Sequence, residues 1–387
     1  MFPDFEPRLR AFAEVIVRTG LNLQRGQRLL IAEPYELQGV ARSAEVLVEA
    51  VIKAAGCDVA VIWGDGASLR EFALNKDWRG FAQLVGANAR RMQEYIHHHD
   101  ALLFLQGSQP RLLDGVPAAE VTELRRIGWE YYGPIAQQLV TGATNWTIAP
   151  APSPAWAHAA YPDLPAEQRL VALWQDIFTA LRINDPSPLA AWQIHLLSLK
   201  QRRDELNAQR LAGLRYQGDG TDLIVTLPPG HVWSTAQLET SSGLPFVANL
   251  PTEEIFTAPH RDSTEGTVSV ARPVNHGGAV MDGIELEFSR GRVVTARART
   301  GGDLLRQLLD TDDGAGRLGE VALIPHETSL ARTKRLFHHP LLDENATNHL
   351  ALGEGYGFSL KSTDRSSLNR SLIHVDLPIA AAVHLSR

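Results

Sequence analysis

The chain has 387 residues and a formal net charge of −7, with 37 Lys and Arg against 44 Asp and Glu. This length exceeds the roughly 250 to 300 residues that one hydrophobic core fills, so we expect two domains. The acidic balance, without basic runs among aromatics, argues against a nucleic-acid partner. No apolar stretch approaches the ~20 residues of a membrane span, and the acidic N-terminus, MFPDFEPRLRAF, does not resemble a signal peptide, so we expect a cytoplasmic protein.

The first part of the chain alternates between helical and strand patterns. Helical spacing covers residues 5–18 and 40–55, and short apolar runs at 29–32, 59–63 and 101–105 predict strands. Nearly continuous apolar strands separated by helices are typical of a mainly parallel sheet covered on both faces. We therefore predict a doubly wound α/β domain, with the one cysteine, Cys57, as a buried strand residue.

A proline-containing run, NDPSP at 184–188, marks the predicted domain boundary. Proline interrupts both helices and β-ladders, so the run is a better boundary than the proline-rich loop predicted at 149–165. A helix at 167–181 precedes it and another, at 195–214, follows it. The sequence thus predicts an α/β N-terminal domain at 1–188 and a metal-binding catalytic domain at 189–387.

Beyond the boundary the pattern changes to short alternating segments. Residues 223–227, 267–271, 284–288 and 293–298 predict strands, residues 289–292 predict a hairpin turn at Gly291, and residues 302–309 predict a helix. The second domain is therefore expected to be α+β and rich in antiparallel strands.

Two motifs in the chain suggest sites that their context does not favour. GAGRLG at 314–319 has dinucleotide-binding spacing, but an apolar run follows it where a helix should open, so we predict a loop that lets backbone approach a site closely. The adjacent histidines at 97–99 point about 100° apart on a helix and are expected at its surface end, as are His338 and His339.

Three segments of the second domain carry metal-capable side chains beside turn residues. They are NLPTEEIFTAP (249–259), DENATNHLALGEGY (343–356) and NRSLIHVD (369–376). In the third, His374 and Asp376 lie two apart in an apolar strand and therefore share a face. Two such groups inside an apolar strand are costly to bury unless they are paired or bind a metal.

An acid in a glycine context, Glu320, completes a mixed set of carboxylates and imidazoles. Such a donor set suits zinc, cobalt, manganese or a similar divalent ion. A bridging carboxylate would hold two ions roughly 3.5 to 4 Å apart, the spacing of dinuclear hydrolases.

Together, and in this order, the three segments and Glu320 resemble the thermophilic metalloaminopeptidase family of the aminopeptidase T type. The resemblance implies an α/β first domain, a catalytic second domain and a homodimer. It implies two divalent ions, zinc, cobalt, manganese or magnesium, bound by the residues that match the family pattern: Glu254, Glu320, His349, His374 and Asp376. It also places Tyr356 near the reacting centre.

The function that follows is hydrolysis of the first bond of peptides with a free N-terminus. Glu320 is the expected bridging ligand, Tyr356 the expected donor to the oxyanion, and Glu253 the expected proton shuttle, although an outer structural role suits Glu253 equally.

Two other functions remain open from the sequence. His349, His374 and Asp376 alone would form the two-histidine, one-carboxylate face of a mononuclear iron dioxygenase that cleaves a dihydroxypyridine ring. A binding protein with a degenerate site is the third possibility.

Overall fold

The computed structural model describes residues 2–34, 39–64, 66–276, 278–325 and 327–386, and these fall into two compact units. One unit comprises Met1–Leu196 and Ala236–Thr252, and the other comprises Leu197–Thr235 and Glu253–Arg387. The return of 236–252 to the first unit has no signal in the sequence. The division at 188/189 stays a prediction of the domain boundary.

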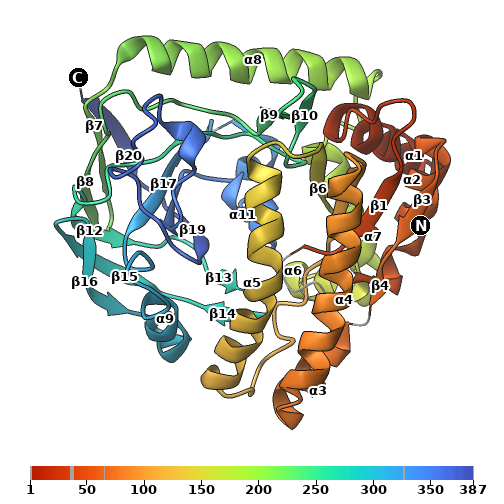
Figure 1. Cartoon of the computed structure of the whole chain (residues 1–387), viewed down its shortest axis with the longest axis horizontal. Helices are drawn as coiled ribbons and strands as arrows, with labels where there is room; N and C mark the ends of the chain where they lie inside the picture. The colour runs from red at the N-terminus through yellow and green to blue at the C-terminus, as the bar shows by residue number, and fades with distance from the viewer. Residues whose placement is uncertain (1, 35–38, 65, 277, 326, 387) are drawn as a thin grey trace. The chain divides into compact units, whose positions relative to one another are not determined.

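The first unit is built on a four-stranded parallel sheet in the order β3-β1-β5-β6. Figure 1 labels β1, β3 and β6 of this sheet. After β1 the chain adds β3 on one side and then β5 and β6 on the other. Because such crossovers are right-handed, this reversal puts α2 on one face and α4 and α5 on the other. Accordingly α1 packs on α2, and α4 packs on α5, β1 and β5, which confirms the doubly wound α/β prediction.

Strands β1, β3 and β5 of the first unit match the predicted apolar runs closely. The strand bounds in this unit are β1 Leu29–Ala32, β2 Val40–Ala41, β3 Val59–Val61, β4 Trp63–Gly64, β5 Ala101–Gln106, β6 Trp146–Pro150, β9 Gln237–Glu239 and β10 Pro245–Val247. β2, β6, β9 and β10 were not predicted. β2 and the 3₁₀ turn after it occupy the first residues of the helix predicted at 40–55, and the prolines that follow β6 gave that stretch the composition of a loop. Cys57 is not a strand residue as predicted: it lies half-buried in the bend between α2 and β3.

The helices of the first unit are α1 Phe5–Glu14, continued by a π-helical turn Val15–Gly20, a 3₁₀ turn Arg42–Ala44, α2 Glu45–Ala55, α3 Gly66–Asn75, α4 Trp78–His97, α5 Ala118–Val140, α6 Pro154–Ala160 and α7 Ala166–Ala180. Helix α6 occupies part of the predicted loop because Ser153 caps it and Pro154 is suited to its first turn. The histidines at 97–99 are exposed at the end of α4, as expected.

Helix α8, Pro188–Gln209, passes from one unit into the other at Leu196 and Leu197. It begins at the proline that was interpreted as a break and ends before the predicted limit at residue 214. Pro188 can begin α8 because the N–H groups of the first helical turn have no partner within the helix, so the N–H that proline lacks is not missed there. Residues 213 and 214 belong instead to β7.

The second unit contains a six-stranded antiparallel sheet in the order β16-β15-β12-β8-β7-β20. Its strands are β7 Gly213–Gly218, β8 Thr221–Thr226, β12 Glu265–Ser269, β15 Glu285–Ser289, β16 Arg292–Arg297 and β20 Ala382–Ser386. In β8 buried and exposed side chains alternate strictly, so one face of the sheet is in the core. The predicted hairpin turn at Gly291 lies between β15 and β16, as expected.

A second antiparallel sheet of this unit, in the order β11-β17-β18-β19, carries the chemistry described below. Its strands are β11 Ile255–Thr257, β17 Leu318–Leu323, β18 His349–Gly353 and β19 His374–Pro378. The remaining elements are a hairpin of β13 Val274–His276 and β14 Ala279–Met281, α9 Gly302–Leu309, α10 Ser329–Thr333, α11 Pro340–Glu344 and a 3₁₀ turn Gly357–Ser359. These antiparallel sheets with short helices confirm the α+β prediction.

Two further expectations are resolved in this unit. His339 is 1% exposed and starts α11, so it is not the surface residue that was predicted. Its burial follows from Asp343, whose carboxylate accepts hydrogen bonds from the backbone of Phe337 and His339. Within the described residues, no helix has the length and apolar character needed to cross a membrane.

Candidate metal centre

Strand register brings the candidate ligands to one face of the four-stranded sheet. Glu320 is opposite Ala351, which is opposite Asp376, and cross-strand neighbours share a face. His349 and His374 each lie two residues from a member of that row, so they project to the same side. Glu254 lies two residues before Phe256, which joins this face through Ala322.

The side chains converge around two imidazoles. His349 Nε2 is 3.4 Å from Glu254 Oε2, 3.3 Å from Glu320 Oε1 and 3.9 Å from Asp376 Oδ1. His374 Nε2 is 3.4 Å from Asp376 Oδ1 and 4.0 Å from Glu320 Oε2. The donor atoms thus form two groups, Glu254-Glu320-His349 and Glu320-His374-Asp376, each with its atoms within 4.8 Å of one another. Glu320 belongs to both.

The second nitrogen of each imidazole is held by a backbone carbonyl. His349 Nδ1 lies 3.1 Å from the carbonyl oxygen of Glu344, and His374 Nδ1 lies 3.0 Å from that of Glu354. A carbonyl can only accept, so each Nδ1 carries the proton, and in the neutral ring each Nε2 presents a lone pair to the carboxylates. Metal-binding histidines are commonly oriented in this way.

The electrostatics favour positive charge at this position. Burial alone lowers the pKa of His349, but Glu254 and Glu320 raise it well above its ordinary value. Burial likewise opposes protonation of His374, but Asp376 and Glu320 raise its pKa to about 9. A divalent cation among the same carboxylates would take the place of these protons.

Glu344 is a fourth acid at the centre that sequence reasoning did not assign. Burial raises its pKa well above the ordinary value, and the nearby charges of Asp376 and Glu254 raise it further. Its carboxyl group also hydrogen-bonds with Asp376. The motif DENATNH contains it five residues before His349, but its position at the end of a short helix left no periodic signal.

Of the two residues expected to assist catalysis, Tyr356 lies against the His374 ring and Glu253 directly precedes Glu254 in the sequence. The Tyr356 ring is half-buried, 5.1 Å from the His374 ring, and stacks on Phe358 at 5.3 Å. Glu253 is 5% exposed, and its backbone N–H donates to Asn345 Oδ1. Five donors of oxygen and nitrogen type, converging on one buried face with their lone pairs oriented, fit a divalent metal.

Comparison with known proteins decides the family. The model of the thermophilic metalloprotease (M29) family matches residues 5–384. Aminopeptidase T from Thermus thermophilus is 37% identical over 97% of this chain and 93% of the relative. Aminopeptidase AmpS from Bacillus subtilis is 32% identical over 98% and 93%. The chain belongs to the thermophilic metalloprotease (M29) family.

Solved structures agree with this M29 assignment. Wild-type AmpT from Thermus thermophilus aligns with a TM-score of 0.88 and 36% identity, covering 99% of this chain and 96% of that one. A dihydroxypyridine dioxygenase from Pseudomonas putida aligns with a TM-score of only 0.47 and 13% identity, which carries no argument for shared chemistry. The predicted family and the predicted metalloprotease class are thereby confirmed.

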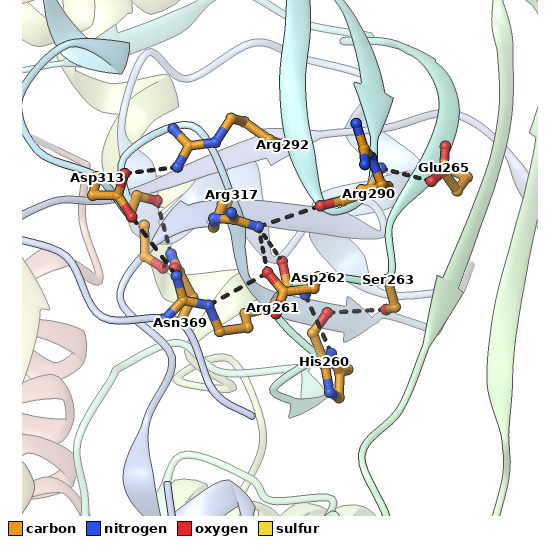
Figure 2. Close-up of polar contacts among 12 residues, drawn as sticks. His260, Arg261, Asp262, Ser263, Glu265, Arg290, Arg292, Asp313, Arg317 and Asn369 are labelled. Carbon is orange, nitrogen blue, oxygen red and sulfur yellow. Dashed lines mark hydrogen bonds and ion pairs between the residues drawn. The ribbon is translucent and has the colours of Figure 1, made fainter. Parts of the chain in front are cut away.

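A polar network of this M29 chain joins the ends of the strands that carry the centre (Figure 2). Arg317, three residues before Glu320, donates to the carbonyls of Arg261 (3.0 Å) and Arg290 (3.3 Å) and to Asp262 Oδ1 (2.8 Å). It therefore connects the start of β17 with the loop after β11 and with the β15–β16 turn.

The buried amide of Asn369 extends this connection to the other two strands of the sheet. Its Nδ2 donates to the carbonyls of Gly314 (2.8 Å) and Gly353 (2.6 Å), which lie before β17 and at the end of β18, while Asn369 itself precedes β19. A side chain at Gly314 or Gly319 would overlap the backbone of Arg370 or Glu354, so glycine at these positions lets backbone segments pass close together. Gly319 lies in β17 rather than in the predicted loop.

Proposed function

We propose that this M29 metalloprotease is an aminopeptidase that removes the N-terminal residue of peptides at a dinuclear divalent metal centre. The proposed ligands are those predicted from the sequence: Glu254, Glu320, His349, His374 and Asp376. The observation that carries the proposal is the position of Glu320, whose Oε1 faces His349 at 3.3 Å while its Oε2 faces His374 at 4.0 Å. One carboxylate that serves two donor groups is the arrangement that a bridged pair of ions requires.

The residues divide the chemistry between them. When bound, two such ions activate water, polarise the scissile carbonyl and offer a position to the substrate's free α-amine. The backbone carbonyls of Glu344 and Glu354 keep both imidazoles directed at the centre. The Tyr356 hydroxyl donates a hydrogen bond to the oxyanion that develops on the scissile carbonyl. Glu253 moves a proton between water and the leaving amine.

The first test measures metal content together with hydrolysis. Dialysis against a chelator should abolish cleavage of a dipeptide, and zinc, cobalt, manganese or magnesium should restore it, with two ions per chain at full activity. Full activity in metal-free protein would exclude the proposal.

The second test concerns the substrate's N-terminus. Because the free α-amine is part of the recognised group, an acetylated peptide should resist cleavage while the same peptide with a free amine is cleaved. Equal rates on the two would indicate an endopeptidase.

The third test separates two ions from one through Glu254, whose Oε2 lies 3.4 Å from His349 Nε2. Glu254→Gln should weaken the binding of one ion and suppress hydrolysis. A mononuclear centre of His349, His374 and Asp376 would keep its ion in this variant. Near-normal hydrolysis would remove Glu254 from the ligand set.

The homodimer is what the family resemblance implies, and the cytoplasmic location is the expectation drawn from the sequence. We propose a homodimer in the cytoplasm. Sedimentation of the purified protein at micromolar concentration, with a mass close to twice 42.5 kDa expected, tests the dimer.

A further inference from the structure

The proposed ligands differ in how their backbones are held. Glu320, His349, His374 and Asp376 lie inside strands whose ladders set their positions. Glu254 does not, because the β11–β17 ladder begins one residue later, at Ile255. Its place therefore depends on contacts outside the sheet.

One amide supplies such a contact. Asn345 is completely buried at the end of α11, and its Oδ1 accepts a hydrogen bond of 2.6 Å from the backbone N–H of Glu253, a residue 92 positions away. Its Nδ2 donates to the carbonyl of Leu341 (2.8 Å) and to Oε1 of Glu344 (3.3 Å). Asn345 thus contacts two residues next to Glu254. Glu253 directly precedes Glu254 in the sequence, and Glu344 faces Glu254 across the centre.

We propose that Asn345 is a positioning residue that fixes Glu254 and Glu344 relative to each other and so sets the metal affinity of the Glu254 side of the centre. The inference rests on the proposed dinuclear function. Asn345 itself is not a ligand, since both ends of its amide are engaged elsewhere.

The role requires an amide. The Glu253 N–H needs an acceptor, whereas the Leu341 carbonyl and the Glu344 carboxylate need donors, and only Asn offers both at this length. The Leu341 carbonyl belongs to the helix that Asn345 ends, so it orients the amide with Oδ1 toward Glu253. Leucine has a similar shape but would leave the buried N–H and carbonyl unsatisfied.

The experiment compares Asn345→Leu with a matched control, Asn145→Leu. Asn145 in the first unit is also completely buried, donates to the carbonyl of Leu21 (2.7 Å) and accepts from Gln27 (2.7 Å). Both variants lose an amide that bridges distant segments, so both should lower the melting temperature of the metal-free protein. Only Asn345→Leu should change metal binding.

Calorimetric titration of metal-free protein with zinc gives the decisive readout. We expect wild type and Asn145→Leu to bind two ions per chain, and Asn345→Leu to bind one of the two about 10 to 100 times more weakly, as when an outer partner of a metal ligand is removed. Unchanged affinity for both ions in folded Asn345→Leu would overturn the role of Asn345 alone. A wild type that binds fewer than two ions would overturn the dinuclear centre itself.

A measurement on wild type keeps the proposal testable if the variant does not fold. The hydrogen bond to Asn345 Oδ1 protects the backbone N–H of Glu253 in metal-free protein. The hydrogen of this amide should therefore exchange with solvent far more slowly than that of an unprotected amide. Exchange at the unprotected rate would contradict the proposal.

Discussion

The four-stranded sheets of the two units both contain deeply buried strands, but these strands carry different side chains. In the first unit, β1 and the apolar part of β5 bury only aliphatic and aromatic residues between two layers of helices. In the second, β17 and β18 are buried almost throughout, yet Glu320 and His349 lie on one of their faces.

The difference shows that burial does not by itself exclude charge. Isolated ionised groups in an apolar interior are too costly to keep, but a set of opposite charges with oriented lone pairs can be kept, and function is the usual reason. The first sheet should therefore contribute stability, whereas the charged face of the second should contribute metal binding at some cost in stability.

Two half-buried histidines repeat the contrast. In the first unit, burial and then Arg182 lower the pKa of His195 to about 4. In the second unit, carboxylates outweigh burial and raise the pKa of His374 to about 9. The same side chain is thus held neutral in one unit and attracts positive charge in the other.

The largest effect should come from Glu320→Gln. It removes the bridging ligand, and because metal ions supply several kcal/mol of transition-state stabilisation, kcat/KM for a dipeptide should fall about 10³-fold or more. The metal-free variant should nevertheless be at least as resistant to urea as metal-free wild type, since a buried acid becomes a neutral amide of the same shape. A large loss of metal-free stability would instead make Glu320 a structural residue.

Next in size is Tyr356→Phe, which keeps the ring against His374 and Phe358 but deletes the hydroxyl. If the hydroxyl donates to the oxyanion, kcat should fall roughly 10² to 10³-fold, with KM and melting temperature little changed. Steady-state kinetics on a leucyl substrate, with a melting curve of the same sample, measure both. Wild-type kcat would leave Tyr356 as a packing residue.

In the first sheet, Phe104→Ala should lower stability and leave metal binding unchanged. Phe104 is completely buried in β5 and contacts the rings of Tyr132 and Trp146. Its loss should lower the free energy of unfolding by about 3 to 5 kcal/mol, while the folded protein binds the same number of ions. Phe104→Leu should cost less. Reduced metal content in folded Phe104→Ala would contradict the idea that the first sheet contributes to stability and not to metal binding.

The smallest effect concerns pH and His195. Its Nε2–H donates to the carbonyl of Thr252 (2.7 Å) and its Nδ1 accepts from Arg182 (2.9 Å), so the folded ring is neutral. Because the pKa of His195 is lowered in the folded protein, the imidazole of the unfolded chain takes up a proton at a higher pH than the folded protein does as the pH falls. Stability is then complete above the unfolded pKa of about 6.5 and is lost as pH falls toward 4, by roughly 1 to 3 kcal/mol.

His195→Gln keeps the neutral hydrogen bonding and provides the comparison. Urea unfolding at pH 7.5 and pH 4.5 should show a smaller difference between the two pH values in the variant than in wild type. An equal difference would show that His195 does not titrate on unfolding.

The sequence by itself determined strands β1, β3 and β5 of the first sheet, the helix at Gly302–Leu309, the hairpin turn at Gly291 and the shared face of His374 and Asp376. These are local properties: a buried strand is a continuous apolar run, and residues two apart on a strand project to one side. The family and its candidate ligands were also predicted, because their motifs are short and continuous.

Only the tertiary structure decided which distant groups meet. The positions of Glu344 and Asn345 beside Glu253 and Glu254, the neutral His195 and the buried His339 have no local signal. They arise from strand register and helix ends that join segments as many as 92 residues apart. Hydrophobic periodicity tells which side of a segment is buried, but the partner it meets there is chosen by the packing of the whole unit.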